Sequence, residues 1–243
     1  MLETSKNSKE TVRALQRKLY RKAKQQPNFR FYSLYDKVYR IDVLQTAYDL
    51  VKQNRGSPGL DGVTFEEIEQ RVGKQEYLLE LKETLKGKTY QAGPIKRVDI
   101  PKGNGETRPL GIPNIEARIV QMAVKLIIEP IFEAGFSDNS YGFRPRRSAH
   151  QAMDSVTEAL AKGYTEVIDA DLSKYFDTIV HDKLMKTVAE RIADKYILRL
   201  LNQWLKALII RVGKDGGKYI IGGGKESRKG TPQRIRVRSL IYD

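Results

Sequence analysis

The sequence predicts an α+β fold in which an antiparallel sheet packs against helices. Short runs of alternating character flank glycine-rich turns in residues 95–113 and 208–221, and such runs are typical of β-hairpins. Segments elsewhere in the chain repeat apolar residues at helical spacing. Strands and helices do not follow a regular βαβ rhythm, so a doubly wound parallel sheet is not expected.

The charge of the chain narrows the choice of partner. The 243 residues include 44 lysines and arginines against 30 acidic residues, which gives a formal net charge of +14. The expected partner is therefore a polyanion, with nucleic acid first and a membrane surface second. No run approaches the ~18 apolar residues that a membrane span needs, and the polar N-terminus has no signal-peptide core. We expect a cytoplasmic protein without membrane contact.

Residue usage also limits the chemistry. The chain has no cysteine and only two histidines, His150 and His181. Disulfides, thiolate zinc sites, cysteine nucleophiles and polyhistidine metal sites are therefore excluded. Any metal ion must be bound by oxygen ligands.

The N-terminal part of the chain predicts two helices. Residues 11–26 form an amphipathic helix with an apolar face and a basic face. The apolar face consists of Val12, Leu15, Leu19 and Ala23. The basic residues are Arg13, Arg17, Lys18, Arg21, Lys22 and Lys24. The alternative is a solvated surface helix, but the excess of basic residues in this part of the chain favours contact with RNA phosphates. A second helix, residues 41–53, ends at a glycine-rich turn.

Turn and cap residues define the middle of the chain. Thr64 and Glu67 form a capping box that opens a short helix. Residues 95–113 form a hairpin that turns at its Gly-Asn-Gly sequence. Asn114 then caps an apolar helix, residues 115–132, whose side chains are expected to pack in the core.

The remaining elements alternate between helix and strand. Ser148 is the expected N-cap of a helix with apolar positions between 149 and 160. The sequence EVIDADL, residues 166–172, predicts a strand. Helical segments follow near 181–207, before the second hairpin turns at 215–217.

Two aspartates on the predicted strand are candidate metal ligands. Residues two apart in a strand point to the same face, so Asp169 and Asp171 are expected to lie side by side. The aromatic residues Tyr175 and Phe176 follow the strand. Oxygen ligands beside an aromatic wall suit a magnesium ion that carries nucleotide phosphates. The alternative is a solvated strand face.

The first hairpin supplies cations for such phosphates. Lys96 and Arg97 precede its first strand, Lys102 lies at the turn and Arg108 lies just after it. Arg108 could clamp phosphate oxygens in a bidentate manner, with Lys102 as a point charge beside it. The alternative is that exposed lysines protect a sheet edge.

Several stretches of this sequence occur together, in one order and spacing, in a known family. They are NRGSPGLDGVT, VDIPKGNGETRPLGIP, NSYGFRPRRSAHQA, IDADLSKYFDTIVHDKL and KGTPQ. In these stretches the chain resembles the reverse transcriptase domain of group II intron-encoded proteins, the maturase-reverse transcriptases. The resemblance covers nearly the whole chain up to Gln233, and the basic first forty residues resemble the N-terminal extension of the family.

The resemblance implies a right-hand polymerase that copies intron RNA into DNA by two-metal nucleotidyl transfer. It divides the chain into a basic N-terminal extension (1–40), fingers (41–112), a partial palm with interleaved fingers segments (113–233) and an atypical tail (234–243). The cofactor it implies is Mg²⁺, with two ions in the complete enzyme.

Site residues are implied by the matching positions. Asp171 would be the catalytic aspartate that binds both magnesium ions, with the Leu172 carbonyl as an extra ligand. Phe176 would be the aromatic gate beneath the incoming sugar. The implied nucleotide-binding residues are Lys96, Lys102, Arg108 and Gln233.

The match gives no catalytic role to four other residues. Asp169 is then expected to be solvated, and Asp177 to hydrogen-bond the following turn. For His150 and His181 we expect packing or a structural hydrogen bond.

One part of the family pattern is missing. Two metal ions need carboxylates from more than one strand. The family supplies them in a Tyr-x-Asp-Asp motif, and this sequence contains no Asp-Asp dipeptide. After Gln233 the sequence departs from the family pattern and reads RIRVRSLIYD, which is typical of a frameshift or a truncation. We therefore expect fingers and a partial palm, without thumb or maturase region, that are inactive alone.

The expected partners are a group II intron RNA, or another RNA template with a DNA primer, and a dNTP. An unfinished sheet could expose apolar surface, so a homodimer is also possible. Two alternatives stay open. One alternative is a non-catalytic module that binds intron RNA. The other is a reverse transcriptase of a retron, a diversity-generating element or a CRISPR-associated system.

Overall fold

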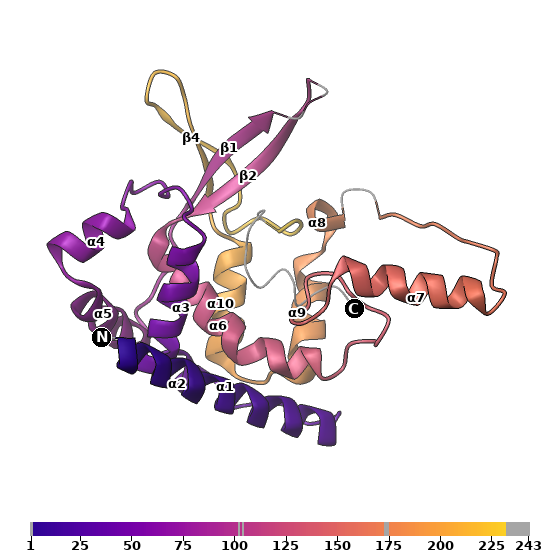
Figure 1. Ribbon diagram of the computed structural model, residues 1–243. Coiled ribbons are helices and arrows are strands. Elements are labelled where there is room, and N and C mark those ends of the chain that lie inside the picture. Colours follow the sequence, from indigo (N-terminus) through magenta and orange to yellow (C-terminus); the bar gives the residue numbers. More distant parts are fainter. Residues whose placement is uncertain (1, 102, 104, 173–174, 232–243) are drawn as a thin grey trace.

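The core of the protein is built around one buried helix. The computed structural model describes residues 2–101, 103, 105–172 and 175–231. Helix α6 (Ile115–Glu133) is apolar on nearly all sides, and α1 (Leu2–Gln25) and α3 (Ile41–Gln53) pack against it and against each other (Figure 1). A helix with apolar residues all round must be covered on every side. The basic N-terminal helix is therefore part of the core through its apolar face.

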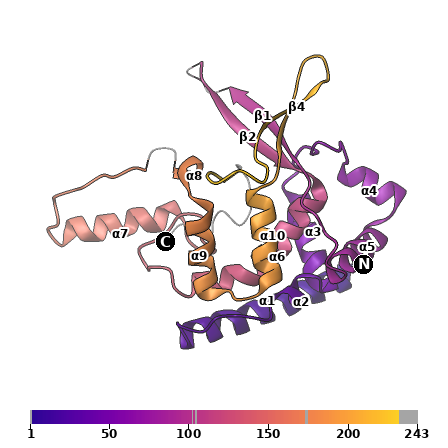
Figure 2. The same ribbon diagram turned by 180° about the vertical axis from the view of Figure 1, so that it is seen from behind.

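Further helices surround this centre. They are α2 (Tyr35–Val38), α4 (Phe65–Arg71), α5 (Lys74–Lys86), α7 (Ala149–Ala161), α8 (Tyr175–Thr178), α9 (His181–Arg191) and α10 (Lys195–Leu205). Helices α9 and α10 pack against each other, whereas α7 extends away from the body of the molecule (Figure 2). No residue of α7 is buried. Within the described ranges, every helix is too short or too polar to cross a bilayer.

A four-stranded sheet rises above the helices. Its strands are β1 (Ile95–Pro101), β2 (Thr107–Pro113), β3 (Ile209–Val212) and β4 (Lys218–Gly222), in the order β2-β1-β3-β4. The α+β class and both predicted hairpins are confirmed, because β1 with β2 and β3 with β4 pair antiparallel. The sheet is nevertheless mixed, since β1 and β3 pair in parallel. No turn joins these two strands, so local sequence could not predict their pairing.

Most helix boundaries and caps agree with the sequence. Helix α3 has the expected bounds, and α1 begins earlier than the expected residue 11. Thr64 and Ser148 each form the side chain and backbone contacts of a capping box. The expectation for Asn114 was only half right. It directly precedes α6, but its Oδ1 accepts a hydrogen bond from the Leu60 N–H at 3.1 Å and does not cap its own helix.

The predicted strand at 166–172 was wrong. These residues are extended but belong to no strand, and the apolar side chains of Val167, Ile168 and Leu172 are 77%, 95% and 71% exposed. A strand needs a neighbour for its N–H and C=O groups. The part of the chain that the structure describes offers none, because the sheet ends with β2 and β4. The alternation that placed Asp169 beside Asp171 therefore has no sheet to enforce it.

A buried carboxylate joins distant parts of the chain. Asp194 is the N-cap of α10, where one oxygen accepts hydrogen bonds from the N–H groups of Tyr196 and Ile197 at 3.0 and 3.3 Å. Its other oxygen accepts from the N–H groups of Leu34 and Tyr35, both at 2.8 Å. One side chain thus fixes the start of α10 and the start of α2.

Asp194→Ala should lower the free energy of unfolding by about 3 kcal/mol or more, because each buried N–H left without an acceptor costs about 1–3 kcal/mol. Asp182→Ala is the matched control, since Asp182 is an exposed aspartate in the first turn of α9. It should cost less than about 1 kcal/mol. Urea unfolding followed by circular dichroism measures both, and equal losses would contradict the role given to Asp194.

Candidate active site and nucleic-acid interface

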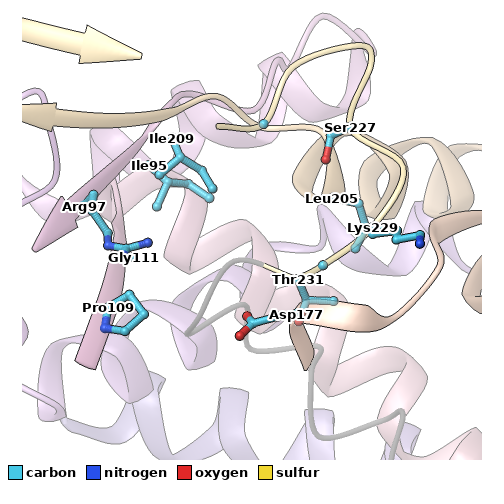
Figure 3. A pocket seen from close by; sticks show the side chains of 12 residues that line it. Ile95, Arg97, Pro109, Gly111, Asp177, Leu205, Ile209, Ser227, Lys229 and Thr231 are labelled. Atoms are coloured by element: carbon cyan, nitrogen blue, oxygen red, sulfur yellow. The ribbon is translucent and has the colours of Figure 1, made fainter. Parts of the chain in front are cut away.

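A cavity of about 240 Å³ lies between the sheet, α8 and the loop after β4 (Figure 3). It contains two cationic side chains, Arg97 and Lys229, and one acid, Asp177. The cavity is lined by Ile95, Arg97, Pro109, Gly111, Asp177, Leu205, Ile209, Gly223, Ser227, Lys229, Gly230 and Thr231. Four segments of the chain therefore meet here: the hairpin 95–113, α8 (175–178), the end of α10 with the start of β3, and the loop 223–231.

Hydrogen bonds hold the loop 223–231 against the α8 turn. The Thr231 N–H donates to the Phe176 carbonyl at 2.8 Å, and the Gly230 N–H donates to the Ile179 carbonyl at 2.9 Å. The His181 N–H donates to the Arg228 carbonyl at 2.9 Å. We call this set of contacts between residues 176–181 and 228–231 the loop clamp.

The His181 side chain also contributes to the loop clamp. It is buried, and its Nε2 lies 2.6 Å from the Gly230 carbonyl oxygen. The oxygen can only accept, so Nε2 carries the proton of this bond. The structural hydrogen bond expected for His181 is confirmed, whereas His150 is exposed on α7.

Gly230 is the one position in the loop clamp that needs glycine. Its φ is +84°, which favours glycine, and a Cβ there would lie 3.2 Å from the Asp177 carbonyl oxygen. Both the backbone conformation and the close approach to α8 therefore oppose a side chain.

The cavity face of the sheet has its own charge network. Arg97 Nε lies 2.8 Å from one Asp99 oxygen, and Arg211 Nη2 lies 2.9 Å from the other. The neighbouring Arg97, and then Arg211, hold the pKa of Asp99 below its usual value. Sequence reasoning listed Arg97 only as one cation among several. Strand alternation was the signal that could have separated it from Lys96, which points to the other face.

Two of the expected nucleotide contacts lie on that other face. Lys96 is half-buried opposite Ile112, and Arg108 is exposed opposite Ile100. Residues directly opposite share a face, and Lys96 and Ile100 are an even number of positions apart, so Lys96 and Arg108 are on one face. They are roughly 13 Å apart along the strand, at about 3.3 Å per residue. Neither lines the cavity.

Phe176 and Asp171 are placed differently. Phe176 is half-buried in α8, its ring makes an edge contact with Tyr175 at 5.2 Å, and its carbonyl belongs to the loop clamp. Asp171 and Leu172 are exposed in the unpaired segment and do not line the cavity. Asp177, expected to bond the following turn, is exposed and lines the cavity. The structure brings the Phe176 turn to the cavity, but not Asp171.

A pair of magnesium ions was expected only in the complete enzyme, and the described residues do not by themselves provide the ligands for it. Asp169 and Asp171 offer carboxylates, but no group of three or more acidic or histidine side chains close enough to hold a metal ion occurs in the described ranges. Two hard cations need several oxygen ligands each. Lys102 and Gln233, the other expected contacts, lie outside the described residues; Gln233 follows two positions after Thr231.

The basic face of α1 is a second candidate surface. Arg13, Arg17, Lys18 and Arg21 are exposed there. Lys22 lies over the Phe29 ring at 4.3 Å, and Lys24 Nζ donates to the Ala134 carbonyl at 3.2 Å. Four of the six expected RNA contacts are thus exposed to a polyanion. The side chains of Lys22 and Lys24 also make contacts within the protein.

Comparison with known proteins gives consistent matches. The chain is 40% identical over 208 residues to the protein YkfC of Escherichia coli K12. The aligned region covers 83% of this chain and 54% of YkfC. It is 32% identical over 185 residues to the group II intron-encoded protein LtrA of Lactococcus lactis subsp. cremoris, and this aligned region covers 73% of this chain and 29% of LtrA. The chain therefore spans about half the length of the first relative and less than a third of the second.

A solved structure and a family model complete the comparison. The partial Cas6-RT-Cas1--Cas2 complex aligns over 82% of this chain and 33% of the matched chain, at 20% identity and a TM-score of 0.41, a likeness too weak to support an argument. The model of the reverse transcriptase (RNA-dependent DNA polymerase) family matches residues 100–235, more than half of the chain. The chain belongs to the reverse transcriptase family.

Proposed function

We propose that these 243 residues are the fingers and first part of the palm of a group II intron-encoded reverse transcriptase, which copies intron RNA into DNA. The observation that carries this proposal is that the hairpin 95–113, α8 (175–178) and the loop 223–231 all contribute to one cavity. The hairpin and α8 lie in stretches where the sequence resembles that family, and the loop ends in a third such stretch, KGTPQ. Their convergence gives the nucleotide one place to bind.

Each segment has a role in this proposal. Lys102, at the hairpin tip, is proposed to bind the triphosphate as a point charge. Lys96 and Arg108, which the resemblance also implies, lie on the face of the sheet opposite the cavity and are not proposed to contact a nucleotide bound there. Arg97 and Lys229 add positive charge at the base of the same hairpin. The ring of Phe176 lies beneath the sugar, and the loop clamp positions the residues that lead to Gln233. Asp171 and the Leu172 carbonyl are the proposed magnesium ligands.

The same proposal assigns these residues an incomplete catalytic centre. The chain contains no Asp-Asp dipeptide, and Asp171 alone cannot hold two metal ions. The residues described by the structure gather no cluster that would replace the missing carboxylates. Nucleotide and nucleic acid should therefore bind without being joined.

A second function of this chain, binding of structured RNA without catalysis, is supported by the exposed arginines of α1. They follow one face of a helix whose other face is fixed in the core by Val12, Leu19 and Ala23. A fixed row of cations can follow a phosphate backbone without reordering the protein. This function needs no metal ion.

Primer extension on an RNA template should be undetectable with this chain, because the carboxylates for two metal ions are not all present. The measurement is extension of a labelled DNA primer with Mg²⁺ and all four dNTPs. Robust extension that Asp171→Ala abolishes would contradict the incomplete catalytic centre. Extension that Asp171→Ala leaves unchanged would indicate a contaminating polymerase.

Neutralising the α1 face should weaken RNA binding and its salt dependence. The variant replaces Arg13, Arg17 and Arg21 by Gln. Each lost phosphate contact reduces the slope of log K against log salt by about 0.7–0.9, so the slope should fall by about 2. Fluorescence anisotropy with a structured RNA, between low and moderate salt, measures this slope.

The matched control removes the same charge elsewhere. Arg71, Lys86 and Lys214 are exposed and lie outside α1. Replacing these three by Gln gives the same net charge and should leave the slope nearly unchanged. Equal effects of the two variants would show that only the total charge matters, and would contradict an RNA surface on α1.

A further inference from the structure

Residues 166–172, which we call the acidic segment, have the backbone of a strand without its partner. The segment is extended and runs between the end of α7 and α8, apart from the four-stranded sheet (Figure 1). Its apolar residues Val167, Ile168 and Leu172 are 77%, 95% and 71% exposed. Within the described ranges no strand pairs with it. Extended backbone with free N–H and C=O groups readily accepts an added strand.

The charge of this segment is opposite to that of the chain as a whole. Glu166, Asp169 and Asp171 are exposed, and the segment contains no basic residue, whereas the net charge of the chain is +14. In a paired strand Asp169 and Asp171 would point to the same face. Two carboxylates so close repel each other unless a cation lies beside them. The matching strand should therefore carry basic residues at alternate positions.

Such a sequence follows Thr231, the last residue that the structure describes. Residues 234–240, which we call the arginine segment, read RIRVRSL, so three arginines alternate with Ile235, Val237 and Ser239. Alternation with a period of two is the pattern of a strand with two different faces. Twelve residues follow Thr231. In extended form they would reach about 40 Å, which is more than the acidic segment needs.

The loop clamp brings the two segments to the same place. The Thr231 N–H donates to the Phe176 carbonyl at 2.8 Å, and Val180 and Lys229 form an antiparallel bridge. Leu172 precedes Phe176 by four positions, so at most about 14 Å separates their Cα atoms. A chain that continues this antiparallel course beyond Thr231 runs along the acidic segment.

The same course sets a register in which unlike charges face each other. Opposed positions are found by counting equal numbers of residues back from Phe176 and forward from Thr231. They are Asp171 with Arg236, Asp169 with Arg238, Val167 with Leu240 and Leu172 with Ile235. Opposite charges and apolar pairs directly across two strands both stabilise the pairing. A slip by one position would place each aspartate opposite an uncharged side chain, so the pattern favours one register.

We propose that the arginine segment pairs antiparallel with the acidic segment of the same chain, with Arg236 at Asp171 and Arg238 at Asp169. The arginine segment supplies the backbone partner and the cations that the acidic segment calls for. A guanidinium at Asp171 competes with a magnesium ion for that carboxylate. The pairing goes beyond the proposed function and does not depend on it.

Hydrogen–deuterium exchange, measured by mass spectrometry on peptides that contain residues 166–172, tests the pairing. In the intact chain, alternate amides of the acidic segment should exchange at least about tenfold more slowly than in the unfolded peptide, because a paired amide must first open. Arg236→Asp with Arg238→Asp places like charges opposite each other and should remove this protection. Adding Asp169→Arg with Asp171→Arg reverses both members of each pair and should restore it.

The matched control is Lys214→Asp with Lys225→Asp, since both lysines are exposed and lie outside the arginine segment. It changes the net charge by the same amount and should leave exchange in the acidic segment as in the wild type. Shortening the chain to end at Gln233 should remove the protection as fully as the reversed arginines do. The melting temperature of each variant checks that the rest of the fold persists.

Four results would overturn the proposal. Exchange at the unfolded rate in the intact chain would show that the acidic segment has no partner. An equal loss in the lysine control would show that only total charge matters. Failure of the fourfold variant to regain protection would contradict the paired charges. Protection that rises with protein concentration, together with a dimer in sedimentation, would assign the partner strand to a second copy of the chain.

Discussion

The loop clamp between residues 176–181 and 228–231 is the constraint on which the candidate site depends. It joins backbone groups about fifty positions apart, and it directs the loop after β4 back over α8. His181 strengthens it from the buried side by donating to the Gly230 carbonyl. These bonds are needed to form the cavity, since the loop 223–231 supplies the lining residues between the sheet and α8. The cavity is therefore a product of long-range backbone pairing.

Local signals in the sequence predicted much of the fold. The capping boxes at Thr64 and Ser148 and both hairpin turns depend on residues a few positions apart, and the structure contains them. Contacts between residues far apart in the sequence could not be predicted. Asp194 has the ordinary sequence of an N-cap, and only the fold brings Leu34 and Tyr35 to its second oxygen. The strand at 166–172 failed for the same reason, since a strand depends on a partner that its own sequence does not specify.

The candidate site shows the same division. The role expected for Phe176 was implied by the family resemblance, and the fold does bring α8, which carries it, to the cavity. The position of Arg97 on the cavity face, and of Lys96 on the other, follows from strand alternation once the strand is known. Lys229 begins the KGTPQ stretch, but its place at the cavity depends on the loop clamp, which local sequence does not specify. Asp171 is exposed, because the segment that carries it pairs with no strand among the described residues.

The most direct test of the cavity as the nucleotide site is photolabelling with 8-azido-dATP followed by mass spectrometry of the peptides. The account predicts label in the hairpin 95–113 and the loop 223–231. The label should be lost in Gly230→Ala, where a Cβ meets the Asp177 carbonyl, and kept in Gly216→Ala, which has a similar φ of +77° and open space around it. Label confined to other peptides, or kept unchanged in Gly230→Ala with intact fold, would contradict the account.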